Sequence, residues 1–238
     1  MIKLLVSVKS VDEALLAARG GADLIDLKDP GAGALGGLPV ATIRAIVAAL
    51  RGAGVTLPVS ATIGDVPMPQ LNDILDRVDA VGGCAVDYVK VGIESAPGAA
   101  RVLDALAGST WRIVPVLIAD RGLDDALVTQ ALGLRFPGLM LDTADKRAGS
   151  LFDALPRAAL QSFVERARAL GVMVGLAGAL RLAHAQALAA LQPDFAGFRS
   201  AVCATDRSGA LDAACLRDLV GAMQRAQCVA AASNAVPI

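Results

Sequence analysis

Histidine and aromatic side chains are scarce in this chain of 238 residues. It contains a single histidine, His184, and Phe, Trp and Tyr together make up 3% of its residues. One histidine cannot form a multi-histidine metal site, and the alanine-rich helical setting of His184 favours a packing or surface role over a catalytic triad. Acid–base chemistry must therefore fall to Lys, Asp, Glu or Tyr, and the core must be built from aliphatic residues.

Cysteine, net charge and long apolar runs are also sparse. The four cysteines have no C-x-x-C spacing, so neither a zinc site nor a disulfide framework is predicted. A net charge of −1 without basic runs argues against nucleic acid or an anionic membrane as a partner. No apolar run approaches the roughly 20 residues of a membrane span. Because Lys3 comes too early for a signal peptide, we expect a cytoplasmic protein.

Short apolar runs alternate with alanine-rich helical segments along the chain. Strands are predicted at 3–9, 23–29, 58–65, 87–93, 112–120, 138–145, 173–180 and 195–203. Helices are predicted between and after them, at 11–19, 39–53, 69–83, 97–108, 123–134, 151–171, 181–191 and 211–231. Eight strand–helix units in this length predict an α/β protein with one domain, a (β/α)₈ TIM barrel over 1–238. A doubly wound sheet would usually carry a glycine-rich turn after its first strand, and residues 7–11 contain no glycine.

Charged residues interrupt the apolar runs of three predicted strands. Asp26 and Lys28 share one face of the second strand, Lys90 lies in the fourth, and Asp142 with the following Lys146 ends the sixth. Desolvating a charge without a partner costs several kcal/mol, so these groups are expected to pair or to serve function. They all fall near the carboxyl ends of their strands, where barrel enzymes place their chemistry. The pattern therefore predicts one shared polar pocket that is catalytic.

A lysine in such a pocket is a candidate nucleophile. Desolvation and a second cation lower the pKa of a lysine, and the neutral amine can then attack a carbonyl. Asp26 could carry protons to and from a carbinolamine, while Asp142 and Lys146 could add an acid–base pair or bind an anion. The residues thus predict Schiff-base chemistry on a small aldehyde or ketone. They leave open which of Lys28, Lys90 and Lys146 forms the imine.

Small and polar residues at the ends of the last two strands predict a phosphate site. Gly178 and Ala179 end the seventh strand region, and Arg199 and Ser200 occupy the eighth. Barrels often bind phosphate at the loops after these two strands, where small residues let backbone N–H groups approach the ligand.

Two other features are expected near the catalytic end of the barrel. The glycine-rich loop 30–39 follows the second strand and is equally compatible with an ordinary connection and with a substrate lid. Asp65 and Asp120 end their strands, and we expect them to form salt bridges or to cap helices.

Six segments of the chain match a known family in order and spacing. They are Leu4–Ser7, Gly20–Pro30, Ser60–Pro67, Asp87–Gly92, Met140–Lys146 and Leu176–Gly178. Together they resemble the (5-formylfuran-3-yl)methyl phosphate synthases of methanofuran biosynthesis. The region of the eighth strand departs from the family, because Ser200 stands where glycine is expected and 206–209 is shortened.

The resemblance implies a specific reaction. The family condenses two molecules of glyceraldehyde 3-phosphate into a furan aldehyde that keeps one phosphate, and it releases the other phosphate and water. Carried over residue by residue, Lys28 would form the Schiff base and Lys90 would accept or donate protons, with Asp26, Asp142 and Lys146 completing the cluster. This chemistry needs neither a metal nor a redox cofactor. The expected partner is a small-molecule triose phosphate.

Three alternatives remain open at this stage. Another Schiff-base aldolase or dehydratase would share Lys28 but give a different product. A sugar-phosphate isomerase would use acid–base chemistry alone, and no imine could be trapped. A phosphate-binding barrel without catalytic activity would use the lysines only as paired structural ions. The alanine-rich helix layer could also hold an interface, so a homo-oligomer is possible.

Overall fold

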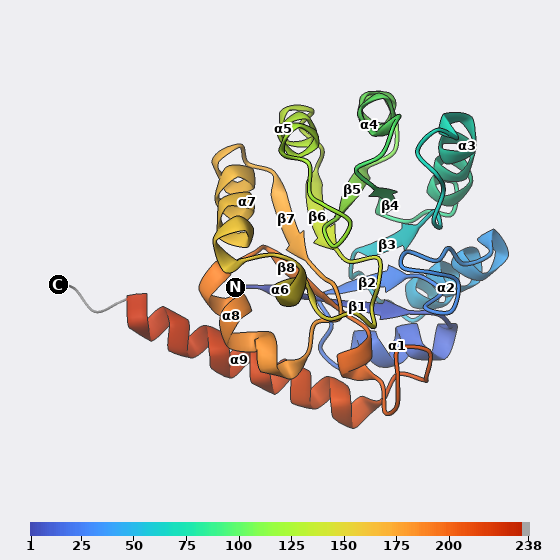
Figure 1. Ribbon diagram of the computed structural model, residues 1–238. Helices are drawn as coiled ribbons and strands as arrows, with labels where there is room; N and C mark the ends of the chain where they lie inside the picture. The colour runs from blue at the N-terminus through green and yellow to red at the C-terminus, as the bar shows by residue number, and fades with distance from the viewer. Residues whose placement is uncertain (235–238) are drawn as a thin grey trace.

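Parallel strands in chain order form the centre of the structure, a computed structural model that describes residues 1–234 (Figure 1). Residues 235–238 of the predicted domain lie outside the described part. Each strand pairs with the next, and β8 pairs back with β1, which closes the barrel. The strands are β1 (Lys3–Val8), β2 (Leu24–Leu27), β3 (Val59–Thr62), β4 (Tyr88–Ile93), β5 (Ile113–Ile118), β6 (Gly138–Asp142), β7 (Met173–Leu176) and β8 (Phe195–Phe198). The prediction of a (β/α)₈ barrel is confirmed.

Helices surround the strands, as Figure 1 shows. The α-helices are α1 (Val11–Arg19), α2 (Val40–Gly52), α3 (Leu71–Gly82), α4 (Ala99–Ala107), α5 (Asp125–Gly133), α6 (Leu151–Ala154), α7 (Arg157–Ala169), α8 (Ala185–Leu191) and α9 (Ala213–Asn234). Two short 3₁₀ turns, η1 (Leu182–His184) and η2 (Ser200–Val202), follow β7 and β8. Within residues 1–234, no helix has both the length and the apolar character that a membrane span requires.

The single helix predicted over 151–171 is wrong, because the structure contains two helices there. Pro156 separates α6 from α7. Leu155 precedes this proline and is extended, with φ −129° and ψ 139°. A proline disfavours helical backbone in the residue before it, so α6 ends and α7 begins anew.

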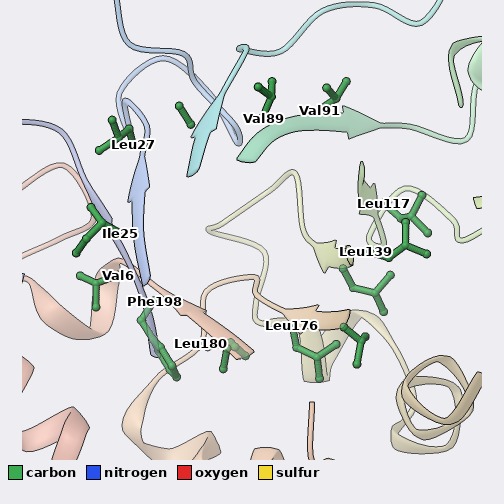
Figure 2. Close-up of a cluster of buried hydrophobic side chains, with 14 of the residues drawn as sticks. Val6, Ile25, Leu27, Val89, Val91, Leu117, Leu139, Leu176, Leu180 and Phe198 are labelled. Carbon is green, nitrogen blue, oxygen red and sulfur yellow. The ribbon is translucent and has the colours of Figure 1, made fainter. Parts of the chain in front are cut away.

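Strand residues alternate between an apolar outer layer and the barrel interior. The outward side chains pack beneath the helices, and Figure 2 shows them around the ring of strands: Val6, Ile25, Leu27, Val89, Val91, Leu117, Leu139, Leu176 and Phe198. A second apolar cluster fills the interior with Leu5, Leu24, Val114, Val116, Met140 and Phe195. Leu24 and Met140 each precede an aspartate by two residues on the same strand face. The interior is therefore apolar toward the amino ends of the strands and charged toward their carboxyl ends.

Candidate active site

The charged residues predicted from the strands meet inside the carboxyl end of the barrel, which we call the mouth. Asp26 and Asp142 are fully buried, Lys28 is 6% exposed and Lys90 is 3% exposed. Lys146 reaches the same place from just beyond β6, and its side chain is 6% exposed. The outward positions of their apolar neighbours on β2, β4 and β6 leave these side chains facing inward. The structure thus brings all five together.

Asp26 lies at the centre of the first ion pair. Its Oδ1 accepts hydrogen bonds from Lys90 Nζ at 3.0 Å and Ser60 Oγ at 2.7 Å, and its Oδ2 accepts one from Ser7 Oγ at 3.1 Å. Ser7, Asp26 and Ser60 are register neighbours on β1, β2 and β3. Burial raises the pKa of Asp26, but the charges of Lys90 and Lys28 outweigh this and hold the pKa below its ordinary value. Asp26 is therefore an ionised, well-anchored carboxylate.

Asp142 forms the second ion pair. Its Oδ1 accepts hydrogen bonds from the Thr143 N–H at 2.8 Å and from the ammonium of Lys146. Its Oδ2 is buried and has no hydrogen-bond partner among the described residues. Burial raises the pKa of Asp142, while Lys146 and Lys28 lower it to a net value below normal. One oxygen of an ionised carboxylate is therefore free for a substrate or a proton.

Lys28 differs from the other two lysines because no hydrogen bond holds its amine within residues 1–234. Burial lowers the pKa of Lys28. The negative charges of Asp142 and Asp26 raise it, the positive charges of Lys146 and Lys90 lower it, and the net pKa is about 8. At pH 7 this leaves roughly one amine in ten neutral, compared with about one in a few thousand for an ordinary lysine. Lys90 and Lys146 are held in ion pairs, whereas the amine of Lys28 is unpaired and easily deprotonated. This difference favours Lys28 as the nucleophile.

Backbone N–H groups without an acceptor within residues 1–234 lie at the mouth, where the sequence predicts a phosphate site. Gly178 and Ala179 follow β7 with φ of 110° and 45°, and neither N–H has an acceptor among the described residues. An alanine in the left-handed region is uncommon, and such outliers gather at ligand sites. Both residues line a cavity of about 20 Å³ together with Ser200, Lys28 and Asp142. This space holds about one water molecule, so a larger ligand requires the mouth to open.

The side chain of Arg199 is held by contacts within the protein that the sequence did not predict. Its guanidinium donates to Glu13 Oε2 at 2.6 Å and Oε1 at 3.1 Å, and to the carbonyl oxygens of Ser7 at 3.1 Å, Arg207 at 2.8 Å and Gly209. These contacts use every N–H donor of the guanidinium. No donor of Arg199 is left for the phosphate predicted to bind there, and the side chain instead ties β8 to α1 and to the loop 207–209.

The loop after β2 covers the mouth. Leu35 is 1% exposed and packs in the interior apolar cluster. Hydrogen bonds also join the loop to other segments: the Leu35 N–H donates to Asp65 at 3.2 Å, Thr62 Oγ1 to the Gly36 carbonyl at 3.0 Å, and Arg207 to the Gly33 carbonyl at 3.1 Å. The loop is therefore a docked cover over the charged cluster.

Asp65 and Asp120 do not have the roles predicted for them. Asp65 binds the Leu35 N–H, and Asp120 accepts hydrogen bonds from the N–H groups of Ala144 at 2.6 Å and Asp145 at 2.8 Å. Within the described part of the chain, both carboxylates therefore hold loops at the mouth and neither forms a salt bridge or caps a helix. Loop N–H groups without a secondary-structure partner need such acceptors.

Replacing Leu35 with alanine is expected to release the loop from the mouth. The substitution removes a buried side chain that contributes about 2–5 kcal/mol to docking, and the hydrogen bonds of the loop do not replace this apolar contact. We expect faster protease cleavage within 30–37 and faster amide exchange there, at unchanged global stability of the barrel strands. Leu170→Ala, at an exposed leucine far from the mouth, is the control. Equal cleavage rates in both variants would contradict the docked-cover description.

The single histidine packs against an aromatic ring. His184 lies against the Phe152 ring with centroids 5.1 Å apart, and its Nδ1 accepts a hydrogen bond from the Arg181 N–H at 3.1 Å. Within residues 1–234, no three His, Cys, Asp or Glu side chains are grouped so that they could hold a metal ion. His184 thus has the packing role expected from its sequence setting.

Solved structures and sequence relatives place this architecture among known proteins. The fold is similar to phosphoribosyl anthranilate isomerase from Thermus thermophilus, with a TM-score of 0.65 at 18% identity over 94% of this chain and 99% of the other. At that identity the likeness shows the barrel fold alone.

Sequence comparison is more specific. The chain is 41% identical over 223 residues to a candidate (5-formylfuran-3-yl)methyl phosphate synthase of Methylorubrum extorquens, covering 93% of this chain and 92% of the relative. It is 36% identical over 223 residues to the (5-formylfuran-3-yl)methyl phosphate synthase of Archaeoglobus fulgidus, covering 87% of this chain and 93% of the relative. The family model described as 4-HFC-P synthase matches residues 4–220. The chain therefore belongs to the 4-HFC-P synthase family.

Proposed function

We propose that this protein condenses two molecules of glyceraldehyde 3-phosphate into (5-formylfuran-3-yl)methyl phosphate, through a Schiff base on Lys28, in the biosynthesis of a methanofuran-type carrier. The observation that carries the proposal is the free amine of Lys28, which lies between two lysine–aspartate ion pairs and has its pKa lowered to about 8. Membership in the 4-HFC-P synthase family supports the product.

The atoms of the proposed reaction balance without an oxidant or reductant. Two glyceraldehyde 3-phosphates contain the atoms of the furan phosphate, one phosphoric acid and two waters. In the product skeleton, the new carbon–carbon bond joins C3 of the triose that loses its phosphate to C2 of the triose that keeps it. The first triose must therefore lose a C2 proton and its C3 phosphate, and the second must become nucleophilic at C2. An iminium on the adjacent C1 makes a C2 proton acidic and stabilises the enamine that follows.

The cluster supplies the proton transfers that these steps need. The neutral amine of Lys28 attacks the aldehyde, and the carbinolamine loses water to form the imine. Asp26 and Lys90, joined at 3.0 Å, form one proton-transfer pair on one side, and Asp142 with Lys146 forms another. The unpartnered Oδ2 of Asp142 is the oxygen best placed to take a proton from carbon. The free N–H groups of Gly178 and Ala179, with Ser200, bind the phosphate of the triose held on Lys28.

Trapping the imine tests this proposal. Purified protein is incubated with glyceraldehyde 3-phosphate and treated with borohydride for intact-mass analysis, and an untreated portion is assayed for phosphate and a furan aldehyde chromophore. We expect a stable adduct, released phosphate and the furan. An adduct without the furan would redirect the assignment to another Schiff-base aldolase or dehydratase. Folded protein that gives neither adduct nor product would overturn the proposal in favour of an isomerase or a binding protein.

The rate of imine trapping should follow the titration of Lys28. Because only the neutral amine reacts, the rate should rise about tenfold per pH unit below 8 and level off above it. Asp142→Asn removes a charge that raises the pKa of Lys28, so the midpoint should move to lower pH. Lys146→Gln removes a charge that lowers this pKa, so the midpoint should move to higher pH. Asp145→Asn, at an exposed aspartate nearby, should leave the midpoint unchanged.

Shifts of the same sign in Asp142→Asn and Lys146→Gln would show that another group controls the reaction. Trapping is followed here as adduct mass against time at each pH, so the profile can be measured even in variants that make no furan.

A further inference from the structure

An open cavity of about 1140 Å³ lies outside the small catalytic cavity at the mouth. Lys146, Ser200 and Arg207 line both cavities, so the two spaces adjoin at these residues. The covering loop contributes Gly33 and Ala34 to the wall of the outer cavity. A molecule in the outer cavity therefore lies next to one bound on Lys28.

The outer cavity has an excess of positive charge. Its wall contains five basic side chains, Arg121, Lys146, Arg147, Arg181 and Arg207, and two acidic ones, Asp145 and Asp206. Both acids accept hydrogen bonds within their own turns: Asp145 from the N–H groups of 147 and 148 at 2.8 and 3.2 Å, and Asp206 from those of 208 and 209 at 2.8 and 3.1 Å. Arg121 pairs with Glu94 at 2.9 Å, and Lys146 pairs with Asp142. Within residues 1–234, Arg147, Arg181 and Arg207 form no salt bridge with a carboxylate, and of these only Arg207 also lines the catalytic cavity.

Arg207 lies at the junction between the two cavities and is held there by hydrogen bonds. Its carbonyl accepts a hydrogen bond from Arg199 Nε at 2.8 Å, and its guanidinium donates to the Gly33 carbonyl at 3.1 Å. Burial lowers the pKa of Arg207, the carboxylates of Asp142 and Asp65 raise it, and Arg199 and Arg147 lower it further, so these charges lie within electrostatic range of its guanidinium. Arg207 remains a cation because a guanidinium does not lose its proton in proteins, and within residues 1–234 it forms no salt bridge with a carboxylate.

We propose that Arg207 and Arg147 form a second anion subsite, which binds the phosphate of the second triose phosphate while the first is held on Lys28. This inference rests on the proposed function, because a condensation of two phosphate esters requires both to be bound at once. The catalytic cavity of about 20 Å³ must open to hold even the first triose phosphate, whereas the outer cavity already has the space and the unpaired cations for the second. Guanidinium groups bind phosphate oxygens with paired, charge-assisted hydrogen bonds.

Calorimetric titration with glycerol 3-phosphate tests the subsite, since this alcohol has the phosphate and length of the substrate but cannot form an imine. We expect the double variant Arg147→Gln/Arg207→Gln to bind one equivalent fewer than the wild-type protein. Arg207→Lys should retain the equivalent with affinity weakened by about 10- to 100-fold, because the charge remains and the paired geometry is lost. Arg101→Gln, which removes one exposed charge on α4 at a residue that lines neither cavity, is the matched control.

Borohydride trapping separates this inference from the proposed function. In the double variant, we expect the single-triose adduct on Lys28 to persist while furan formation falls and its KM for triose phosphate rises. An unchanged number of glycerol 3-phosphate equivalents, or furan formation with wild-type KM, would overturn the second subsite. Absence of any adduct in the wild-type protein would instead count against the Schiff-base reaction, and the titration would still decide whether the anion subsite exists.

Discussion

Replacement of Lys28 by arginine is expected to remove the borohydride-stable adduct and to lower furan formation by about 10³-fold or more. Arginine keeps the positive charge between the ion pairs of Asp26 and Asp142, but its guanidinium does not lose a proton in proteins. The variant therefore tests nucleophilicity separately from charge. Loss of a catalytic nucleophile commonly costs several powers of ten in rate, since the remaining groups act only in concert with it.

Intact-mass analysis and the furan assay measure this variant. Lys3→Arg, at an exposed lysine that begins β1 at the opposite end of the barrel, is the matched control and should behave as wild type. An adduct of normal yield in Lys28→Arg would move the imine to Lys90 or Lys146, and peptide mapping of the reduced protein would show which. That outcome would contradict the argument from the free amine.

Glu13→Gln is expected to lower the free energy of unfolding by about 3–5 kcal/mol, the largest loss of stability among the substitutions considered. Glu13 is buried and bound to Arg199 through both carboxylate oxygens, at 2.6 and 3.1 Å. Burial raises the pKa of Glu13, but Arg199 lowers it to a net value below normal, so the pair is ionic in the folded protein. Glutamine leaves a buried guanidinium without its counter-charge.

Urea denaturation measures this loss, and Asp12→Asn is the matched control because Asp12 is exposed in the same turn of α1. The control should lie within about 0.5 kcal/mol of the wild type. A Glu13→Gln variant as stable as the control would show that Arg199 is not held as a structural ion. Its guanidinium would then be available for phosphate, as the sequence alone had predicted.

Much of the fold and of the charged cluster can be predicted from sequence because strand side chains alternate with a period of two. Lys28 and Lys90 stand between aliphatic residues that must face the helices, so their inward direction follows from the pattern. The same alternation also contains the signal for Ser7 and Ser60, which our sequence reasoning missed. Each is a polar residue at an inward position between two apolar neighbours of its strand. Their partner, Asp26, becomes evident only with the strand register.

Loop residues were harder to interpret. Arg199 follows β8 where phosphate is commonly bound, yet it is paired with Glu13, which is 186 residues away in the chain. Arg207 and Leu35 carry no local pattern that distinguishes them from other loop residues. Their positions depend on how separate loops pack against one another at the mouth, and no periodicity encodes that packing.

By itself, the sequence determined the barrel and the inward direction of its charged strand residues, because both depend on local periodicity. It also determined the family, because the matching segments occur in the family's order and spacing. Only the tertiary structure decided which charged side chains pair with one another. It tied Lys90 to Asp26 and Lys146 to Asp142, left Lys28 free, and used every donor of Arg199 within the chain. Pairing and desolvation act through space across strands and loops that are distant in sequence, so the chemistry of each lysine emerges only when the barrel closes.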